Sequence, residues 1–235
     1  MSIKTASVSI VYGLENPQAV MHLLETAGRI SHASGDSKSD ASAESFVRMI
    51  IKLGHESVLE HACITVRVVC DRATAQQWLR HRLASYTMES QRYVSYKEID
   101  FIDPEFKDAD GTMWTFDEVD DNLSAPAGIK AMYGAFEDSC CESTKKYREL
   151  RDMKVPPEDA RSVLPNCTKT VFFSTANIRS WRHFFNERCQ PAAQHNIRKL
   201  ALSLLDQMHS KLPACFQDIY DKYYGCASSP SAPAQ

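Results

Sequence analysis

Glycine-rich binding loops are missing from this sequence. Its 8 glycines, spread over 235 residues, form neither a G-x-G-x-x-G pattern nor a P-loop, which argues against a Rossmann or P-loop nucleotide site. The G-x-S-x-G turn of many serine hydrolases is missing as well,. If a dinucleotide binds this chain, arginine side chains and helix ends must hold its phosphates instead.

The sequence also has no long apolar segment and no surplus of basic charge. No run approaches the ~20 apolar residues of a membrane span, and the N-terminus lacks a signal-peptide pattern. Hydrophobic residues make up 43%, and the net charge is -3, which gives no general attraction to nucleic acid or to anionic membranes. We therefore expect a cytoplasmic protein without either partner, in which any anion site is local.

Cysteines are frequent, but they do not form a recognisable framework. The 8 cysteines include no C-x-x-C pair, and no secretion signal accompanies them. We expect reduced, mostly buried thiols. A nucleophilic cysteine remains an alternative, although none is flanked by an activating pattern.

Periodicity and capping residues predict the order of elements. In the first half we expect a strand over 5–12, a helix from Asn16-Pro17 to about Ala27, a loop over 31–41, a helix over 42–53, a strand over 62–69 and a helix from Asp71 into Arg80-His81-Arg82. In the second half we expect an exposed acidic excursion over 102–124, helices over 126–151, 178–186 and 192–211, a short helix from Pro157, and a strand over 168–175. One α+β domain over 1–226, with a mixed sheet core flanked by long helices, precedes a disordered tail over 227–235.

The segment 80–93 is the richest in functional side chains. It contains three arginines, a histidine and the hydroxyl groups of Ser85, Thr87 and Ser90. Guanidinium groups suit phosphate and carboxylate oxygens, and three of them this close repel each other unless an anion lies among them. The composition favours a phosphate-bearing ligand. A solvated basic face, or pairing with acidic residues, is the simpler alternative.

The segment 54–61 concentrates two histidines and two glutamates. The spacing is not H-E-x-x-H, and one helix face cannot present both His55 and His61, which are six residues apart. We therefore expect no metal. Polar groups lining a small-molecule pocket and a buried hydrogen-bond network both remain open.

Two later segments also carry arginines. In the first, Arg161 either joins an anion site or pairs with Glu158 at i, i+3. In the second, Asn177 is a helix N-cap, and Arg179, His183 and Asn186 follow along a similar stripe, with aromatic residues on the other face. An amphipathic helix with a solvated polar side is the alternative here.

Together these segments resemble the flavin-dependent thymidylate synthases. The family signature is Arg-His-Arg, seven residues and Ser, and here Arg80-His81-Arg82 is followed in that way by Ser90. The match continues through Gln91-Arg92-Tyr93, covers about 55–201 and adds Arg29-Ile30-Ser31. The other matching motifs follow in the expected order: His55-x-Ser57-x-x-Glu60-His61, Arg161-x-Val163-Leu164-Pro165, Asn177-x-Arg179, His183-Phe184, Arg188 and Ala193-Gln194.

The resemblance implies a specific reaction. Such enzymes methylate dUMP to dTMP with methylenetetrahydrofolate as carbon donor, and NADPH reduces a bound FAD, which passes hydride to the pyrimidine. They form homotetramers with active sites between subunits. No cysteine nucleophile is needed.

The resemblance also assigns residues. Arg188 would be catalytic, because a fixed cation at the uracil ring stabilises negative charge at N3 and the adjacent carbonyl. The residues implied for FAD are Ser31, Ser57, Arg80, His81, Arg82, Met88, Asn177, Arg179 and His183. Those implied for dUMP are Gln77, Arg80, Met88, Ser90, Gln91, Arg92, Arg161 and Arg188.

One position departs from the family pattern. Where the family has a Glu or Gln, this chain has Thr87-Met88, with Glu89 one step later. A thioether does not accept hydrogen bonds as a carboxylate does, so we expect Met88 to contact ligands only through its backbone. The departure motivates an alternative, a catalytically impaired flavin- and nucleotide-binding homologue. A third class, an RNA-binding module, is disfavoured by the near-neutral charge.

Overall fold

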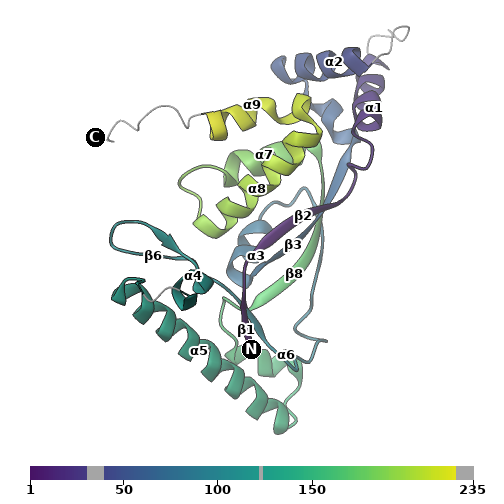
Figure 1. Cartoon of the computed structure of the whole chain (residues 1–235). Coiled ribbons are helices and arrows are strands. Elements are labelled where there is room, and N and C mark those ends of the chain that lie inside the picture. The colour runs from purple at the N-terminus through teal and green to yellow at the C-terminus, as the bar shows by residue number, and fades with distance from the viewer. Residues whose placement is uncertain (31–39, 122–123, 226–235) are drawn as a thin grey trace. The chain divides into compact units, whose positions relative to one another are not determined.

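The computed structural model describes residues 1–30, 40–121 and 124–225, which form two compact units (Figure 1). We name each unit after one of its helices. The α5 unit contains helix α5 (Ala127–Asp152) and comprises Met1–Ser7, Val68–Arg80 and Thr87–Phe172. The α7 unit contains helix α7 (Ile178–Arg188) and comprises Val8–Arg67, His81–Tyr86 and Phe173–Gln235.

Four strands are hydrogen-bonded in the order β2-β3-β8-β4. They are β2 (Ser7–Tyr12), β3 (Cys63–Asp71), β8 (Lys169–Asn177) and β4 (Ser85–Met88). Buried and more exposed residues alternate along β3 and β8, as the two-residue period of a strand requires. β3 and β8 both contribute residues to both units.

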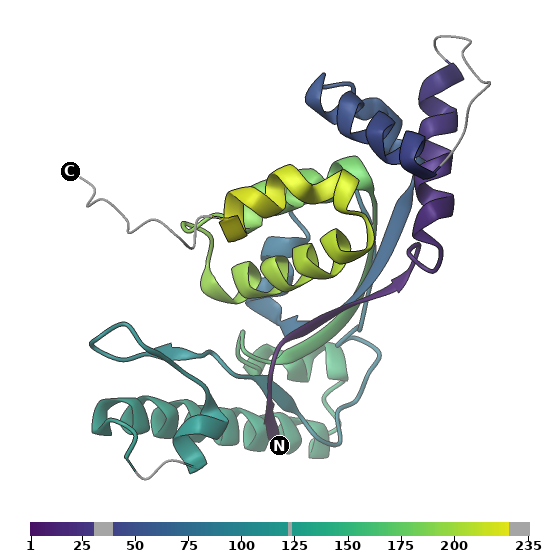
Figure 2. The same cartoon turned by 45° about the horizontal axis from the view of Figure 1, so that its top comes forward.

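The α7 unit is mainly helical. Its other helices are α1 (Pro17–Ile30), α2 (Asp40–Lys52), the 3-10 helix η1 (Glu56–His61), α8 (His195–Lys211) and α9 (Pro213–Tyr224). Figure 2 shows α8 and α9 side by side, and both contact α7. α1 and α2 approach closely at Gly28, where an added Cβ would lie 2.4 Å from the Phe46 ring.

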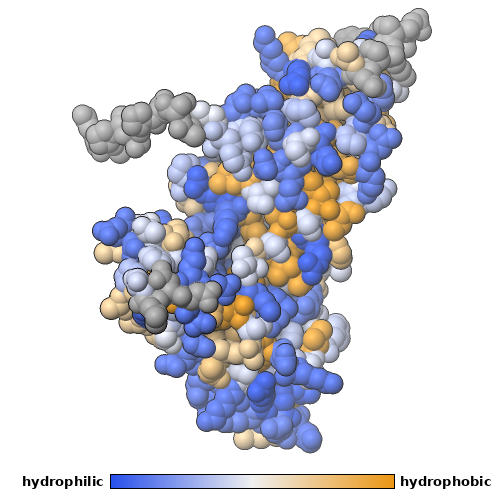
Figure 3. Space-filling view, in the orientation of Figure 1, coloured by the Kyte–Doolittle hydropathy of each residue, from blue (hydrophilic) through white to orange (hydrophobic). Residues whose placement is uncertain are grey.

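The α5 unit contains one long helix and several short elements. These are β1 (Ser2–Lys4), α3 (Arg72–Trp78), β5 (Asp100–Ile102), β6 (Phe106–Lys107), β7 (Met113–Trp114), α4 (Phe116–Asp121), α6 (Pro157–Ala160) and η2 (Arg161–Val163). β1 and β5 pair in parallel, whereas β6 and β7 are antiparallel. Hydrophilic residues cover the C-terminal end of α5, at the bottom of Figure 3.

The prediction of an α+β fold with long helices is confirmed, and several helix starts are confirmed at their capping residues. Asn16 accepts from the Ala19 amide at 3.1 Å, and Asp71 accepts from the Thr74 amide at 2.7 Å. The predicted helices over 126–151 and 178–186 correspond to α5 and α7. The loop expected over 31–41 falls largely outside the described residues, as does the tail over 227–235. The domain boundary at 226 stays a prediction.

The prediction that a helix runs into Arg80-His81-Arg82 is wrong. α3 ends at Trp78, and His81 and Arg82 lie in the connection to β4. The Tyr86 hydroxyl donates to the His81 carbonyl at 2.6 Å. This bond uses a carbonyl that a continuing helix would need for its own ladder, so it favours a turn at this point.

The segment 102–124 is more than the exposed excursion we expected. It contains β6, β7 and α4, and Asp103 is buried. The Asp103 carboxylate accepts from the Tyr133 hydroxyl at 2.8 Å and from the Phe116 amide at 2.7 Å. Aromatic rings scattered among the acidic residues, including Phe106 and Phe116, pack edge-on against Tyr133 of α5. These aromatic contacts hold the segment against α5, although its acidic composition alone predicts an exposed segment.

The seven cysteines in the described residues are free, and four of them are buried, which agrees with the expectation of mostly buried thiols for this part of the chain. Burial raises the pKa of Cys189 and of Cys215 to about 12. Neither is an activated nucleophile at neutral pH, because the reactive form is the thiolate.

Candidate flavin and nucleotide site

The predicted site residues separate into two sets that follow the two units. The α5 unit contains Gln77, Arg80, Met88, Ser90, Gln91, Arg92 and Arg161. The α7 unit contains Ser57, His81, Arg82, Asn177, Arg179, His183 and Arg188. The first set is the predicted dUMP set without Arg188, and the second holds most of the predicted FAD set. Ser31 lies outside the described residues.

In the α5 unit, Glu158 brings two predicted arginines together. Arg92 donates from Nε to the Glu158 carboxylate at 2.6 Å, and Arg161 donates from Nε to the Glu158 main-chain carbonyl at 2.9 Å. The alternative that we considered for Arg161 was an ion pair with the Glu158 side chain. This alternative is wrong, because the acceptor is the Glu158 main-chain carbonyl. The side chains of Arg92 and Glu158 are 59% and 42% exposed, so their ion pair contributes little stability. A phosphate can replace the carboxylate at modest cost.

Gln91 adds a buried donor to the same unit. The residue is 5% exposed, and its side-chain Nε2 has no hydrogen-bond partner within the described residues. An unmade hydrogen bond at a buried donor costs on the order of 1–3 kcal/mol. A ligand oxygen that accepts this bond would recover that cost. The neighbouring Ser90 shapes the turn after β4, because its Oγ accepts from the Arg92 amide at 3.2 Å.

The position where the chain leaves the family pattern has a defined structure. Met88 ends β4 and is half-buried, and the Glu89 amide donates to the Val171 carbonyl at 2.9 Å. The Glu89 carboxylate accepts from the Tyr96 hydroxyl at 2.6 Å. Burial, with this carboxylate second, raises the pKa of Tyr96. The Glu89 carboxylate is thus bonded to Tyr96.

In the α7 unit, the first turn of α7 combines two features that favour an anion. Asn177 caps the helix by accepting from the Ser180 amide at 2.8 Å, and the first turn has no acidic residue. The positive end of the helix dipole therefore lies beside Arg179. Arg179 pairs with Glu60 at 2.6 Å, but both side chains are about half exposed, so the pair is weak.

The C-terminal end of α7 contains a contact between two motif residues far apart in sequence. Arg188 donates from Nε to His81 Nε2 at 2.9 Å. The His81 ring lies edge-on to Phe184, with ring centres 4.9 Å apart, and to His183 at 6.0 Å. Burial, followed by the positive charges of Arg188 and His183, lowers the pKa of His81 to about 4. The imidazole is therefore neutral at physiological pH and can accept this bond.

Arg182 of α7 has a structural role that we did not predict from the sequence. It is 5% exposed and forms two bonds with the Asp218 carboxylate, at 2.8 and 2.7 Å. It also donates to Glu56 at 3.1 Å and to the Cys215 carbonyl at 2.6 Å. Arg182 thus joins η1, α7 and α9. In the sequence, Arg182 lies next to Trp181, between the polar stripe and the core face of the helix. No neighbouring residue indicates that it connects these three helices.

In the segment 54–61, both glutamates pair with arginines of α7. Glu56 pairs with Arg182, and Glu60 pairs with Arg179. Within the described ranges, no group of three or more potential metal-ligating side chains comes together. The two glutamates thus form ion pairs with α7, and whether the segment also lines a ligand pocket stays a prediction.

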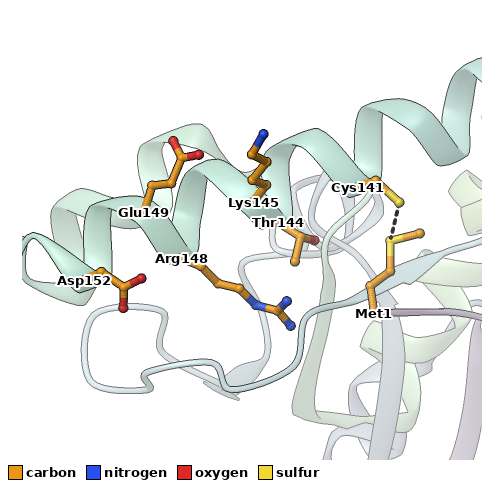
Figure 4. A pocket seen from close by; sticks show the side chains of 7 residues that line it. All are labelled: Met1, Cys141, Thr144, Lys145, Arg148, Glu149 and Asp152. Carbon is orange, nitrogen blue, oxygen red and sulfur yellow. Dashed lines mark hydrogen bonds between the residues drawn. The ribbon is translucent and has the colours of Figure 1, made fainter.

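A pocket of about 510 Å³ on α5 lies apart from the predicted residues. Figure 4 shows Cys141, Thr144, Lys145, Arg148, Glu149 and Asp152 along the helix, with Met1 beside Cys141. None of these is a predicted site residue. The pocket is therefore not part of either set.

Comparison with known proteins places these residues in one class. Residues 15–214 match the family model described as thymidylate synthase complementing protein. A flavin-dependent thymidylate synthase of Geobacter sulfurreducens is 33% identical over 95% of this chain and 89% of its own length. That of Pyrococcus furiosus is 33% identical over 79% and 70%, and that of Mycobacterium sp. strain JLS is 32% identical over 83% and 78%.

The chain therefore belongs to the flavin-dependent thymidylate synthases, a family of enzymes. The matched region includes residues of both units and all predicted site residues. None of the helices in residues 1–30, 40–121 and 124–225 combines the length and apolar character that a membrane span requires.

Proposed function

We propose that this protein methylates dUMP to dTMP, with methylenetetrahydrofolate as carbon donor and FAD reduced by NADPH as the source of hydride. Within this reaction, bound FAD, once NADPH has reduced it, would supply the hydride that completes the methyl group. The observation that carries the proposal is the convergence of Arg92 and Arg161 on Glu158, in the unit that holds the unpartnered Gln91 nitrogen. These groups form a donor set of the kind that a nucleoside monophosphate needs.

The α5-unit residues would bind dUMP. The dUMP phosphate would take the place of the Glu158 carboxylate at Arg92, since charge-assisted bonds to phosphate are the stronger ones. Arg161, which donates to the Glu158 main-chain carbonyl, would be a second cation for the phosphate. Gln91 would donate to a ligand oxygen from its buried nitrogen. The rest of the set is Gln77, Arg80, Ser90 and the backbone of Met88.

The α7-unit residues fit FAD. The pyrophosphate of FAD needs positive charge, and the chain has no glycine-rich loop to supply it. Arg179 at the N-terminal turn of α7 and the exposed Arg82 supply that charge, in agreement with the preference of helix N-termini for phosphate. Exchange of Glu60 for phosphate at Arg179 costs little, because the existing pair is half exposed,. Ser31, Ser57, Arg80, His81, Met88, Asn177 and His183 complete the set.

Arg188 would be the catalytic cation. Its guanidinium would stabilise negative charge that develops at N3 and the adjacent carbonyl of the uracil ring. The neutral state of His81 supports this role, because the neutral ring adds no second positive charge next to Arg188.

The assembly and location follow the same proposal. The enzyme would be a cytoplasmic homotetramer, with active sites between subunits and with neither nucleic acid nor membrane as partner. The predicted ligand residues of this chain are spread over several separated segments. Active sites formed by residues from more than one subunit are consistent with such a distribution.

The alternative function is a flavin- and nucleotide-binding homologue with impaired turnover. It is favoured by Met88 and by the commitment of the Glu89 carboxylate to Tyr96. In this case the protein binds both ligands and exchanges electrons with NADPH, but it forms no dTMP.

Visible absorption tests the proposal. The purified protein, with FAD added in excess and then removed by gel filtration, should keep an oxidised flavin spectrum. NADPH should bleach this spectrum, and dTMP should form when dUMP and methylenetetrahydrofolate are present. Protein that takes up no flavin contradicts the proposal. Bleaching without dTMP supports the alternative.

A further inference from the structure

The hydrogen bond between Arg188 and His81 joins two residues that are 107 positions apart. Arg188 is the last residue of α7, and His81 lies in the connection between α3 and β4. Both residues belong to the α7 unit. The family motifs give each of them a ligand of its own, but they do not relate one side chain to the other.

His81 is held in place by contacts around it. The Tyr86 hydroxyl of β4 donates to its carbonyl at 2.6 Å, and the buried Phe184 ring packs edge-on against the imidazole. His183 lies on a further side, with ring centres 6.0 Å apart. A side chain restrained in this way can fix the direction of a partner that bonds to it.

The guanidinium of Arg188 transmits this direction. It is planar and rigid, so one fixed N–H sets the directions of its other donors. Nε2 of His81 accepts this bond only while it carries no proton, which places the ring proton on Nδ1.

We propose that His81 is a positioning residue for the substrate, in which its neutral imidazole holds the Arg188 guanidinium in the orientation that meets the uracil ring of dUMP. The inference rests on the proposed function and extends it, because it gives the central histidine of the signature a second role besides its contact with FAD. His81 acts through Arg188 and touches no reacting atom in this role.

The role has a consequence for pH. Among the described residues, the charged or titratable side chains that shift the pKa of His81 are Arg188 and His183, both from α7; from β4, the Tyr86 hydroxyl reaches the His81 carbonyl. Protonation of His81 removes the acceptor and sets two cations side by side. The affinity for dUMP should therefore fall as pH is lowered towards 4, through loss of the His81–Arg188 bond.

A double-mutant cycle on dUMP affinity tests the proposal. Dissociation constants are measured at pH 8 with FAD in excess, for wild type, His81→Phe, Arg188→Met and the double variant. Phenylalanine keeps the ring packing and removes the acceptor. His81→Phe should weaken dUMP binding by about tenfold in the wild-type background, as expected for a charge-assisted hydrogen bond that is partly exposed. In the Arg188→Met background the same substitution should change affinity by less than about twofold.

Two controls separate this role from general damage. His209→Phe changes a histidine whose ring contacts Gln217 and Tyr220, and it should leave dUMP affinity unchanged. His81→Asn, which is too short to reach Arg188, replaces His81→Phe if the latter does not fold, and the same loss is expected. Flavin content is recorded for every variant, since His81 also contributes to FAD binding in the proposed function.

The outcomes are distinct. If His81→Phe weakens dUMP binding equally in both backgrounds, His81 acts independently of Arg188 and the inference is wrong, although the proposed function stands. If wild type binds neither FAD nor dUMP, the proposed function fails and the inference fails with it.

Discussion

Glu158 accepts hydrogen bonds from two arginines, one through its carboxylate and one through its carbonyl. At the scale of single residues this arrangement explains how two guanidinium groups can lie near one another. An acidic side chain of the same unit screens their repulsion, and its exposure keeps the pair weak enough to exchange,. In the α7 unit, Glu60 forms a similarly exposed ion pair with Arg179.

The first prediction concerns Arg92. Arg92→Gln should weaken dUMP binding by about ten- to thirtyfold, because it removes a charge-assisted bond to phosphate. It should change the free energy of unfolding by less than about 1 kcal/mol, since the pair with Glu158 is exposed. Titration with dUMP and urea denaturation measure the two effects. Arg148→Gln, an exposed arginine of α5 outside the predicted set, is the matched control, and an equal loss of affinity in that variant would argue against a specific role for Arg92.

A second residue-scale prediction concerns stability and pH. The pKa of His81 is lowered to about 4 in the folded protein, against ~6.5 in the unfolded chain. Above the unfolded value both states are neutral and the contribution of His81 is complete; as pH falls from ~6.5 towards 4, only the unfolded chain takes up the proton, so stability is lost. Urea denaturation at pH 7 and pH 5 should therefore show a smaller loss in His81→Phe than in wild type. Equal losses in both proteins would contradict the lowered pKa.

At the scale of elements, α7 organises the unit that carries the predicted flavin set. Its N-terminal turn has the cap Asn177, its C-terminal residue Arg188 contacts His81, and its middle is fixed by Arg182 to η1 and α9. The Trp181 indole donates to the Ile64 carbonyl of β3 at 3.1 Å. These contacts fix the middle of the helix, and the proposed function has ligands bind at its two ends.

The third prediction tests this attachment. Arg182→Met should lower the free energy of unfolding by about 2–4 kcal/mol, because it removes the buried partner of two partly exposed carboxylates, Glu56 and Asp218,. Arg179→Met, on the same helix but with a half-exposed pair, should cost less than about 1 kcal/mol. Urea denaturation of both variants gives the comparison. A loss at Arg182 no larger than at Arg179 would show that the buried network does not hold the helix.

The sequence predicted those elements whose signals are local. Caps such as Asn16, Asp71 and Asn177 lie within three residues of the amides they bind, so the helix starts were readable. The partner of Arg182 is 36 residues away on α9, a helix that we did not predict. The end of α3 and the folding of 102–124 also depend on contacts with side chains outside the predicted element, namely Tyr86 and Tyr133.

The candidate site was predictable to a similar degree. Motif spacing predicted which residues belong to the site, but it did not predict which of them contact one another. Arg92 pairs with Glu158, 66 positions away, and Arg188 pairs with His81, 107 positions away. Such pairs have no periodic signal in the sequence.

At the scale of the whole molecule, the proposed function requires the two sets of predicted residues to take part in one reaction. The proposal places the active sites between subunits of a homotetramer. Sedimentation velocity should then give the mass of four 26.5 kDa chains, and activity should fall in parallel with dissociation on dilution. A monomer with full activity would contradict this arrangement.

The central claim is that the chain uses a flavin to methylate dUMP, and release of tritium from dUMP labelled on its pyrimidine ring at the carbon that is methylated tests it most directly. With NADPH and methylenetetrahydrofolate present, wild type should release tritium to water and form dTMP only when FAD is bound, and Arg188→Met should keep its flavin yet release almost none. Tritium release that does not depend on FAD, or no release from flavin-loaded wild type, would contradict the account.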